Sequence, residues 1–120
     1  MKRRPEEILQ RAVVQFLNLA APKVVFWHVP NQKGTRKTWE QGLLKAMGLK
    51  AGVADLCLVL PGGRAAFIEL KVADGKQRKE QAEFQAEAEA AGALYAICRS
   101  VDDVNATLKA WNAPMRGCLP

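Results

Sequence analysis

The stretch from Phe67 to Val72, FIELKV, places a glutamate and a lysine two positions apart inside an otherwise apolar run. Side chains alternate across a β-strand, so Glu69 and Lys71 are predicted to point to the same face of a sheet. Burying charged groups on such a face is unfavourable unless they are paired or used for chemistry. The pair therefore predicts either a structural ion pair or a functional site.

A second acid, Asp55, lies in the preceding apolar run, VADLCLVL, which PGGR separates from AAFIELKV. This arrangement predicts a β-hairpin. If PGG forms the loop, Leu60 pairs with Arg64. In that register Asp55 faces Glu69, and opposite residues of an antiparallel pair share a face of the sheet. A shorter loop at the two glycines would instead pair Asp55 with Leu70, and the sequence leaves both registers open.

Two carboxylates at such close range repel each other, and both stay ionised only when they share a cation. Oxygen ligands favour a hard divalent ion, and Mg²⁺ commonly binds one or two carboxylates together with waters and phosphate. A neighbouring lysine can orient a metal-bound water and offset charge on a phosphate. Asp55, Glu69 and Lys71 therefore predict a phosphodiester hydrolase that uses Mg²⁺, with Mn²⁺ able to replace it.

These residues must be positioned by the surrounding helices and strands. The order of the predicted helices and strands indicates an α/β fold, with one mixed β-sheet and helices on both faces. Both hairpin strands are apolar on both faces, which is typical of central strands. Gly92 is expected to end a helix, and Ser100 with Asp103 is expected to begin the last one. The predicted elements are helix 5–20, strand 24–31, a short helix within 39–47, strands 53–60 and 65–72, helix 77–92, strand 93–99 and a helix to about 111.

Length and composition restrict the class of protein. A chain of 120 residues predicts a single domain over 1–120, and the formal charge of +6 favours polyanionic partners. No apolar run reaches the ~18 residues that a bilayer requires, and no signal-peptide core follows the basic N-terminus, so we expect a cytosolic protein without a membrane partner. Cys57, Cys98 and Cys118 form no CxxC pair, which makes a zinc site unexpected and favours Cys57 and Cys98 as core residues.

The motifs together resemble a known nuclease family. GVADL at 52–56 followed by IELK at 68–71 resembles the PD-(D/E)xK signature, with Val53 and Ala54 where a proline often precedes the aspartate. PEEILQ near the start, VPN before a basic loop, and KEQAEF after the lysine resemble the VRR-NUC branch of that superfamily. The resemblance spans about residues 5–105 and implies a restriction-endonuclease-like core in the order α-β-β-β-α-β.

The resemblance also implies roles for individual residues. Asp55 and Glu69 correspond to the metal-binding acids, the carbonyl of Leu70 to a further ligand, and Lys71 to the catalytic lysine. Glu6 corresponds to a helix glutamate that reaches the metal directly or through water, and Gln81 to a glutamine directed at the active site. The polar and basic residues expected near the substrate are Gln10, Asn31, Lys33, Arg36 and Lys37.

Each of these residues also has a structural explanation. Asp55 could cap a turn, and Glu69 with Lys71 could form a cross-strand ion pair. Glu6 could simply favour the positive end of a helix, and Gln81 is a good helix former in any context. His28 stands alone and is not expected to act as a general base.

The function implied by the resemblance is metal-dependent hydrolysis of DNA. Stand-alone members of the VRR-NUC branch resemble homodimeric endonucleases of bacteria or phages that act on branched DNA such as four-way (Holliday) junctions. We therefore expect DNA and a second copy of the chain as partners. The alternative is a non-catalytic nucleic-acid-binding module that keeps the nuclease-like fold and the basic surface. A structural domain with an incidental ion pair is a third possibility.

Overall fold

The computed structural model describes residues 5–30 and 38–116 of the chain. Its elements are α1 (Pro5–Ala20), β1 (Val25–His28), α2 (Thr38–Ala46), β2 (Leu56–Leu60), β3 (Arg64–Leu70), α3 (Lys79–Ala90), β4 (Leu94–Cys98) and α4 (Val101–Ala110). Their order is the predicted one. The strands are shorter than the apolar runs from which they were predicted, because the apolar runs extend beyond the residues that pair between neighbouring strands.

The strands form one mixed sheet in the order β1-β2-β3-β4. The β1–β2 and β2–β3 pairs are antiparallel and the β3–β4 pair is parallel, so β2 and β3 are the central strands, as predicted. Leu60 pairs with Arg64 and Leu56 pairs with Ile68. The three-residue PGG loop is therefore the correct register, and the two-residue alternative is wrong.

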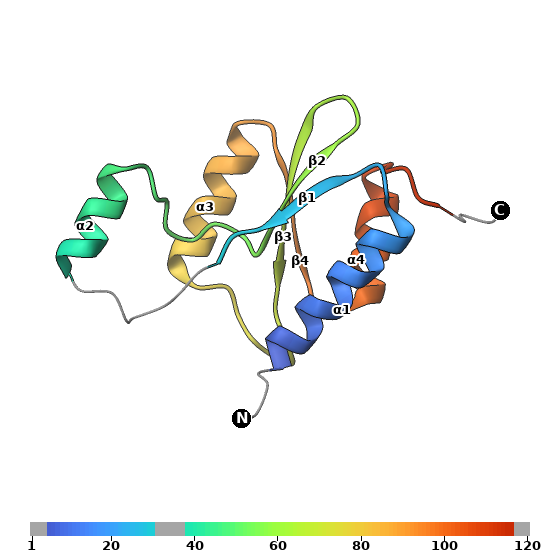
Figure 1. Ribbon diagram of the computed structural model, residues 1–120, viewed down its shortest axis with the longest axis horizontal. Coiled ribbons are helices and arrows are strands. Elements are labelled where there is room, and N and C mark those ends of the chain that lie inside the picture. Colours follow the sequence, from blue (N-terminus) through green and yellow to red (C-terminus); the bar gives the residue numbers. More distant parts are fainter. Residues whose placement is uncertain (1–4, 31–37, 117–120) are drawn as a thin grey trace.

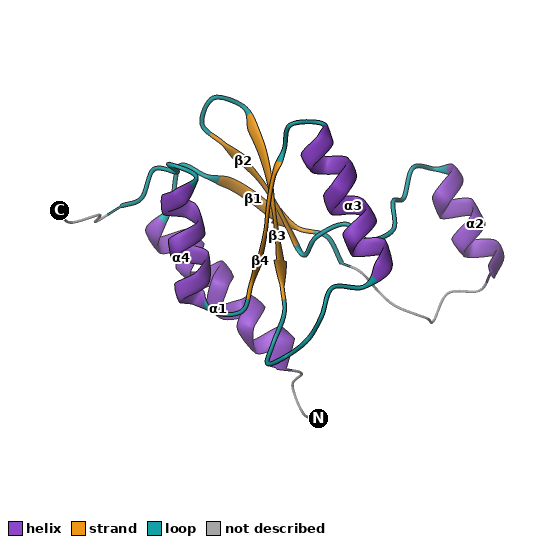
Figure 2. Cartoon of the chain, turned by 180° about the vertical axis from the view of Figure 1, so that it is seen from behind, coloured by secondary structure: helices purple, strands orange, loops and turns teal. Residues whose placement is uncertain are grey.

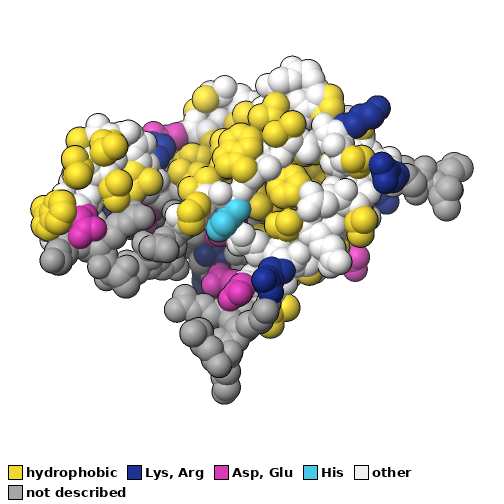
Figure 3. Space-filling model, in the orientation of Figure 1, with side chains coloured by type: hydrophobic (Ala, Val, Ile, Leu, Met, Phe, Trp, Pro, Cys, Tyr) yellow, Lys and Arg dark blue, Asp and Glu magenta, His cyan; other side chains and the backbone are white. Residues whose placement is uncertain are grey.

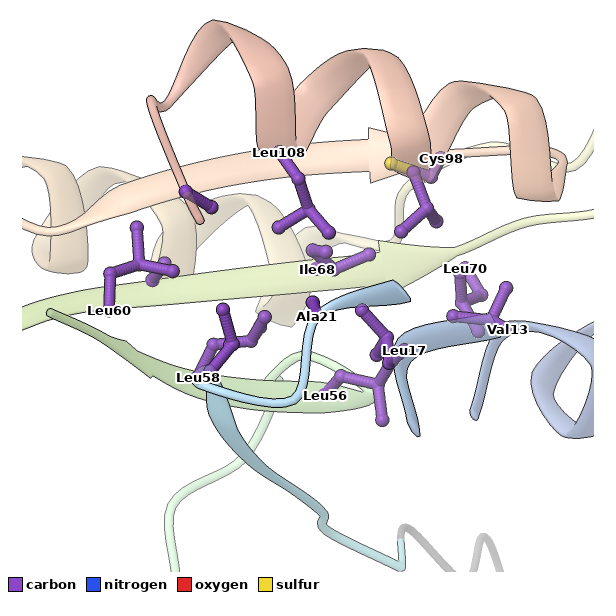
Figure 4. Packing of buried hydrophobic residues seen from close by; sticks show 14 residues of the cluster. Val13, Leu17, Ala21, Leu56, Leu58, Leu60, Ile68, Leu70, Cys98 and Leu108 are labelled. Atoms are coloured by element: carbon purple, nitrogen blue, oxygen red, sulfur yellow. The ribbon is translucent and has the colours of Figure 1, made fainter. Parts of the chain in front are cut away.

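Helices α1 and α4 cover one face of the sheet and α3 lies on the other, while α2 lies at the periphery (Figures 1 and 2). On the face beneath α1 and α4, alternate strand residues such as Leu58 and Ile68 are fully buried. Leu17 from α1 and Leu108 from α4 pack against them (Figure 4). Burial of such aliphatic side chains stabilises the fold by roughly 1.5–3 kcal/mol each.

The opposite face of the sheet holds a smaller aromatic cluster beneath α3. Phe67 of β3 and Phe84 of α3 meet edge to face with ring centroids 5.0 Å apart, and Tyr95 of β4 packs beside them. Alanine and glutamate dominate α3, so these few apolar contacts fix which side of the helix faces the sheet. The cluster therefore orients the first turn of α3 over the end of β3.

The predicted helix termini are confirmed at two positions. Gly92 has a φ of +97°, the left-handed conformation that commonly follows the end of a helix. The hydroxyl oxygen of Ser100 accepts a hydrogen bond of 3.0 Å from the backbone N–H of Asp103, as an N-cap should. The Asp103 carboxylate accepts from the N–H of Arg99, which reinforces the entry into α4.

Two further predictions concern the cysteines and the membrane. Cys57 and Cys98 are both buried, as expected of core residues. Cys118 lies outside the described residues. None of the helices in the described part of the chain has the length and apolar character to cross a bilayer.

Candidate active site

The structure brings Asp55, Glu69 and Lys71 together on the α3 face of the sheet. Glu69 lies within β3, Lys71 directly follows β3, and Asp55 directly precedes β2. Asp55 and Lys71 were predicted within strands and are instead flanking residues, because the β2–β3 pairing begins at Leu56 of β2 and the β3–β4 pairing ends at Leu70 of β3. The alternation of side chains nevertheless continues past the strand ends, and the three side chains converge.

A buried hydrogen-bond network links the acid and the lysine through α3. The ammonium nitrogen of Lys71 lies 3.4 Å from Oε2 of Glu69, and both side chains are almost entirely buried. Gln81 donates from Nε2 to Oε2 of Glu69 at 2.6 Å and accepts from Lys71 at Oε1 at 2.9 Å. The same Oε1 accepts from the backbone N–H of Arg78 at 2.8 Å, which caps α3 and fixes the amide orientation. Gln81 therefore holds Glu69 and Lys71 in one arrangement.

Asp55 is attached to the sheet at two points. Oδ2 of its half-buried carboxylate accepts a hydrogen bond of 2.8 Å from the backbone N–H of Leu70. Its backbone carbonyl accepts from Nδ1 of His28 at 2.8 Å and from the N–H of Val29 at 3.3 Å. Asp55 thus caps the end of a strand, as the structural alternative predicts. This hydrogen bond uses only one of its two carboxylate oxygens.

The pKa values of both acids are raised. Burial is the main reason that the pKa of Glu69 rises to about 7, and the negative charge of Asp55 adds to the effect while Lys71 opposes it. Burial also raises the pKa of Asp55, with the charge of Glu6 as a smaller contribution, although the hydrogen bond from Leu70 opposes this. Acids whose pKa values are raised by burial and by mutual repulsion are a typical feature of functional sites.

The donor atoms fit a hard divalent cation. Oε1 of Glu69 is buried and makes no hydrogen bond of standard geometry with the described residues, although the backbone N–H of Asp55 lies close enough to the carboxyl to lower its pKa. Carboxylate oxygens are the ligands that Mg²⁺ and Mn²⁺ prefer. In residues 5–30 and 38–116 no three His, Cys, Asp or Glu side chains gather closely enough to hold a metal ion. Backbone, water and substrate oxygens would therefore complete the shell around Asp55 and Glu69.

The other predicted site residues are placed differently. Glu6 lies exposed in the first turn of α1, close enough for its charge to raise the pKa of Asp55. Gln10 is half-buried one turn further along α1. Leu70 buries its side chain on the opposite face and donates its N–H to Asp55. The roles of Glu6, Gln10 and the Leu70 carbonyl remain predictions. The predicted substrate-binding residues Asn31, Lys33, Arg36 and Lys37 lie outside the described residues.

His28 contacts Asp55, although no spacing of residues in the sequence predicts this contact. It is the last residue of β1 and its ring contacts the backbone of Asp55. Its charge lowers the pKa of that acid. The contact joins residues 27 positions apart in the chain. Only the pairing of β1 with the start of β2 predicts such a contact, and the sequence did not identify that pairing.

Gly52, three residues before Asp55, is predicted to be essential to the local backbone. Its φ is +80°, and a Cβ there would lie 2.1 Å from the carbonyl oxygen of Glu80 in α3. Gly62 in the hairpin loop has a similar φ of +90° but open space around it. We expect Gly52→Ala to lower the free energy of unfolding by more than about 3 kcal/mol and Gly62→Ala by about 1 kcal/mol. Urea denaturation measures both, and equal losses would contradict the predicted clash.

Comparison with known proteins identifies the fold. No protein-family model matches the sequence. No curated protein matches it either. Among solved structures, one described as a VRR_NUC domain protein superposes with a TM-score of 0.68 at 20% identity, covering 92% of this chain and 90% of its own. Another, described as a VRR_NUC domain, gives a TM-score of 0.61 at 18% identity over 88% of this chain and 96% of its own. The chain therefore has the mixed α/β fold of VRR_NUC domain proteins, in agreement with the resemblance seen in the sequence.

Proposed function

We propose that this protein is a metal-dependent nuclease that hydrolyses phosphodiester bonds in DNA. The observation that carries the proposal is the convergence of Asp55, Glu69 and Lys71, in which the buried Oε1 of Glu69 makes no hydrogen bond of standard geometry with the described residues. A stable ion pair would not need a second acid beside it, because mutual repulsion of the carboxylates is destabilising. The nuclease-like fold and the formal charge of +6 support a polyanionic substrate.

In the proposed mechanism Asp55 and Glu69 hold Mg²⁺ or Mn²⁺, with Glu6 and the Leu70 carbonyl as further candidate ligands. When bound, the cation supplies charge to the scissile phosphate and lowers the pKa of water. Lys71 places its ammonium group beside the reacting phosphate and stabilises the charge that develops there. Gln81 keeps that ammonium group oriented through the hydrogen bond of 2.9 Å. Preorganised groups of this kind need little rearrangement during reaction.

Cleavage assays test this proposal directly. The purified protein is incubated with labelled linear, flap and four-way DNA in Mg²⁺, Mn²⁺ or EDTA, beside the variant Asp55→Ala. We expect metal-dependent cutting by the natural protein, faster on branched than on linear DNA, and none by the variant. Equal background cutting by both proteins would refute the nuclease function. Binding of DNA without any cutting would favour the non-catalytic module instead.

A metal-binding measurement gives a second readout that does not depend on activity. A ligand that binds only the folded protein raises its melting temperature. Mn²⁺ is therefore expected to raise the melting temperature of the natural protein in calorimetry, and to have no effect on Asp55→Ala. An equal response in the two proteins would place the ion elsewhere.

We also propose that the protein is a homodimer and that this arrangement suits branched DNA. Trp39 and Leu43 of α2 and Met47 directly after it lie at a spacing of four residues and are all exposed. No residue of this nine-residue helix is buried, and helices shorter than ~12 residues are rarely stable without packing. Figure 3 shows hydrophobic side chains gathered on α2 and over β1. A second copy that covers α2 would also supply two active sites related by symmetry.

Substitution in α2 tests the dimer. We expect the natural protein to have twice the chain mass of 13.2 kDa by light scattering, and Leu43→Glu to have the monomer mass with a circular dichroism spectrum that loses no more than the helical signal of α2. Leu19→Glu on α1 is the matched control, because Leu19 is also an exposed leucine on a helix. A monomeric natural protein, or equal effects of both substitutions, would contradict the proposed interface.

A further inference from the structure

We infer that His28 is a positioning residue that fixes the backbone from which the Asp55 carboxylate projects, an inference that rests on the nuclease function proposed above. Asp55 precedes β2 and therefore lacks the full set of ladder hydrogen bonds that would hold a strand residue. Its carboxylate is held from the β3 side by the N–H of Leu70. Its carbonyl is held from the β1 side by the imidazole of His28.

The imidazole makes the shorter of the two bonds at this carbonyl. Nδ1 of His28 lies 2.8 Å from the oxygen, whereas the backbone N–H of Val29 lies at 3.3 Å, beyond the usual range for such bonds. A carbonyl oxygen can only accept, so the proton must reside on Nδ1 of the ring. Although the side chain of His28 is exposed, its Nδ1–H has a defined partner in the Asp55 carbonyl.

The consequence for the site is geometric. A shift of the backbone at Asp55 would move its carboxylate relative to Glu69 and Lys71, because the side chain projects from that backbone directly before β2. A displacement of about 1 Å in a catalytic group can lower a rate by about 10²-fold. The hydrogen bond from His28 restrains the backbone of Asp55 from the β1 side, whereas the hydrogen bond from Leu70 restrains its carboxylate from the β3 side.

Three substitutions separate the two ring nitrogens of His28. The side-chain amide of asparagine can reach the position of Nδ1, whereas that of glutamine reaches the position of Nε2. We expect His28→Ala and His28→Gln to lower kcat for DNA cleavage by about 10-fold to 100-fold with KM within twofold, and His28→Asn to restore at least half of the natural kcat. Loss of activity in all three, with a higher KM, would assign His28 to substrate contact and overturn the positioning role.

A second measurement needs neither metal nor DNA. Hydrogen exchange of the Leu70 amide reports on its bond to Asp55, and we expect exchange at least tenfold faster in His28→Ala and His28→Gln than in the natural protein or His28→Asn. If the natural protein cuts DNA and His28→Ala cuts equally well, the inference fails while the nuclease function stands. If the natural protein does not cut, the nuclease function fails, and unchanged Leu70 exchange in all variants would overturn the inference as well.

Discussion

Replacing Lys71 with methionine is expected to lower the rate of DNA cleavage by about 10³-fold while the protein remains folded. Lys71 is buried, and its ammonium group contacts Glu69 and Gln81 directly. Methionine keeps an unbranched apolar side chain in the same space but removes the charge that would stabilise the reacting phosphate. The loss should therefore appear in the rate constant for cleavage measured under single-turnover conditions, with saturating Mg²⁺.

The matched control for this variant is Lys76→Met. Lys76 is exposed in the segment that joins β3 to α3, so its removal lowers the net charge equally without touching the network. We expect its cleavage rate to stay within about threefold of the natural rate, since one exposed charge contributes modestly to DNA affinity. A Lys71→Met protein that keeps more than a tenth of the natural rate would show that the lysine serves only the ion pair.

The second large effect concerns Glu69 and the pH dependence of stability in the presence of EDTA. Because burial raises the pKa of Glu69 to about 7, the folded protein retains a proton that the unfolded chain releases near 4.5. The contribution of Glu69 to the free energy of unfolding is then greatest at low pH and decreases as the pH rises from about 4.5 through about 7. The expected decrease is on the order of 3 kcal/mol.

Glu69→Gln should remove most of this dependence, because glutamine does not titrate. Urea denaturation between pH 4.5 and 8 in EDTA measures the slopes, with the exposed Glu83→Gln as the control that keeps the natural slope. Saturating Mn²⁺ should reverse the trend in the natural protein, since metal binding favours the ionised carboxylate. Parallel curves for the natural protein and Glu69→Gln would mean that the pKa of Glu69 is not raised in the folded state.

Much of the site followed from local rules. The two-residue period of a strand placed Glu69 and Lys71 on one face, and one of the two possible hairpin registers placed Asp55 opposite Glu69. The sequence could not choose between the two hairpin registers, because both loop lengths suit PGGR. The structure decides for the longer loop, in which Gly62 and Gly63 both adopt positive φ angles that other residues rarely adopt.

The sequence by itself determined the order of the elements and the grouping of Glu69 with Lys71, because side-chain alternation acts over a short distance along one strand. The register that brings Asp55 to this pair was decided by the structure. Only the tertiary structure decided that Gln81 joins Glu69 to Lys71 and that His28 holds Asp55. The pattern of α3 is too weakly amphipathic to fix its rotation, so the aromatic contacts with the sheet had to do so. The partner of β1 is likewise chosen by long-range packing, which no local spacing of residues encodes.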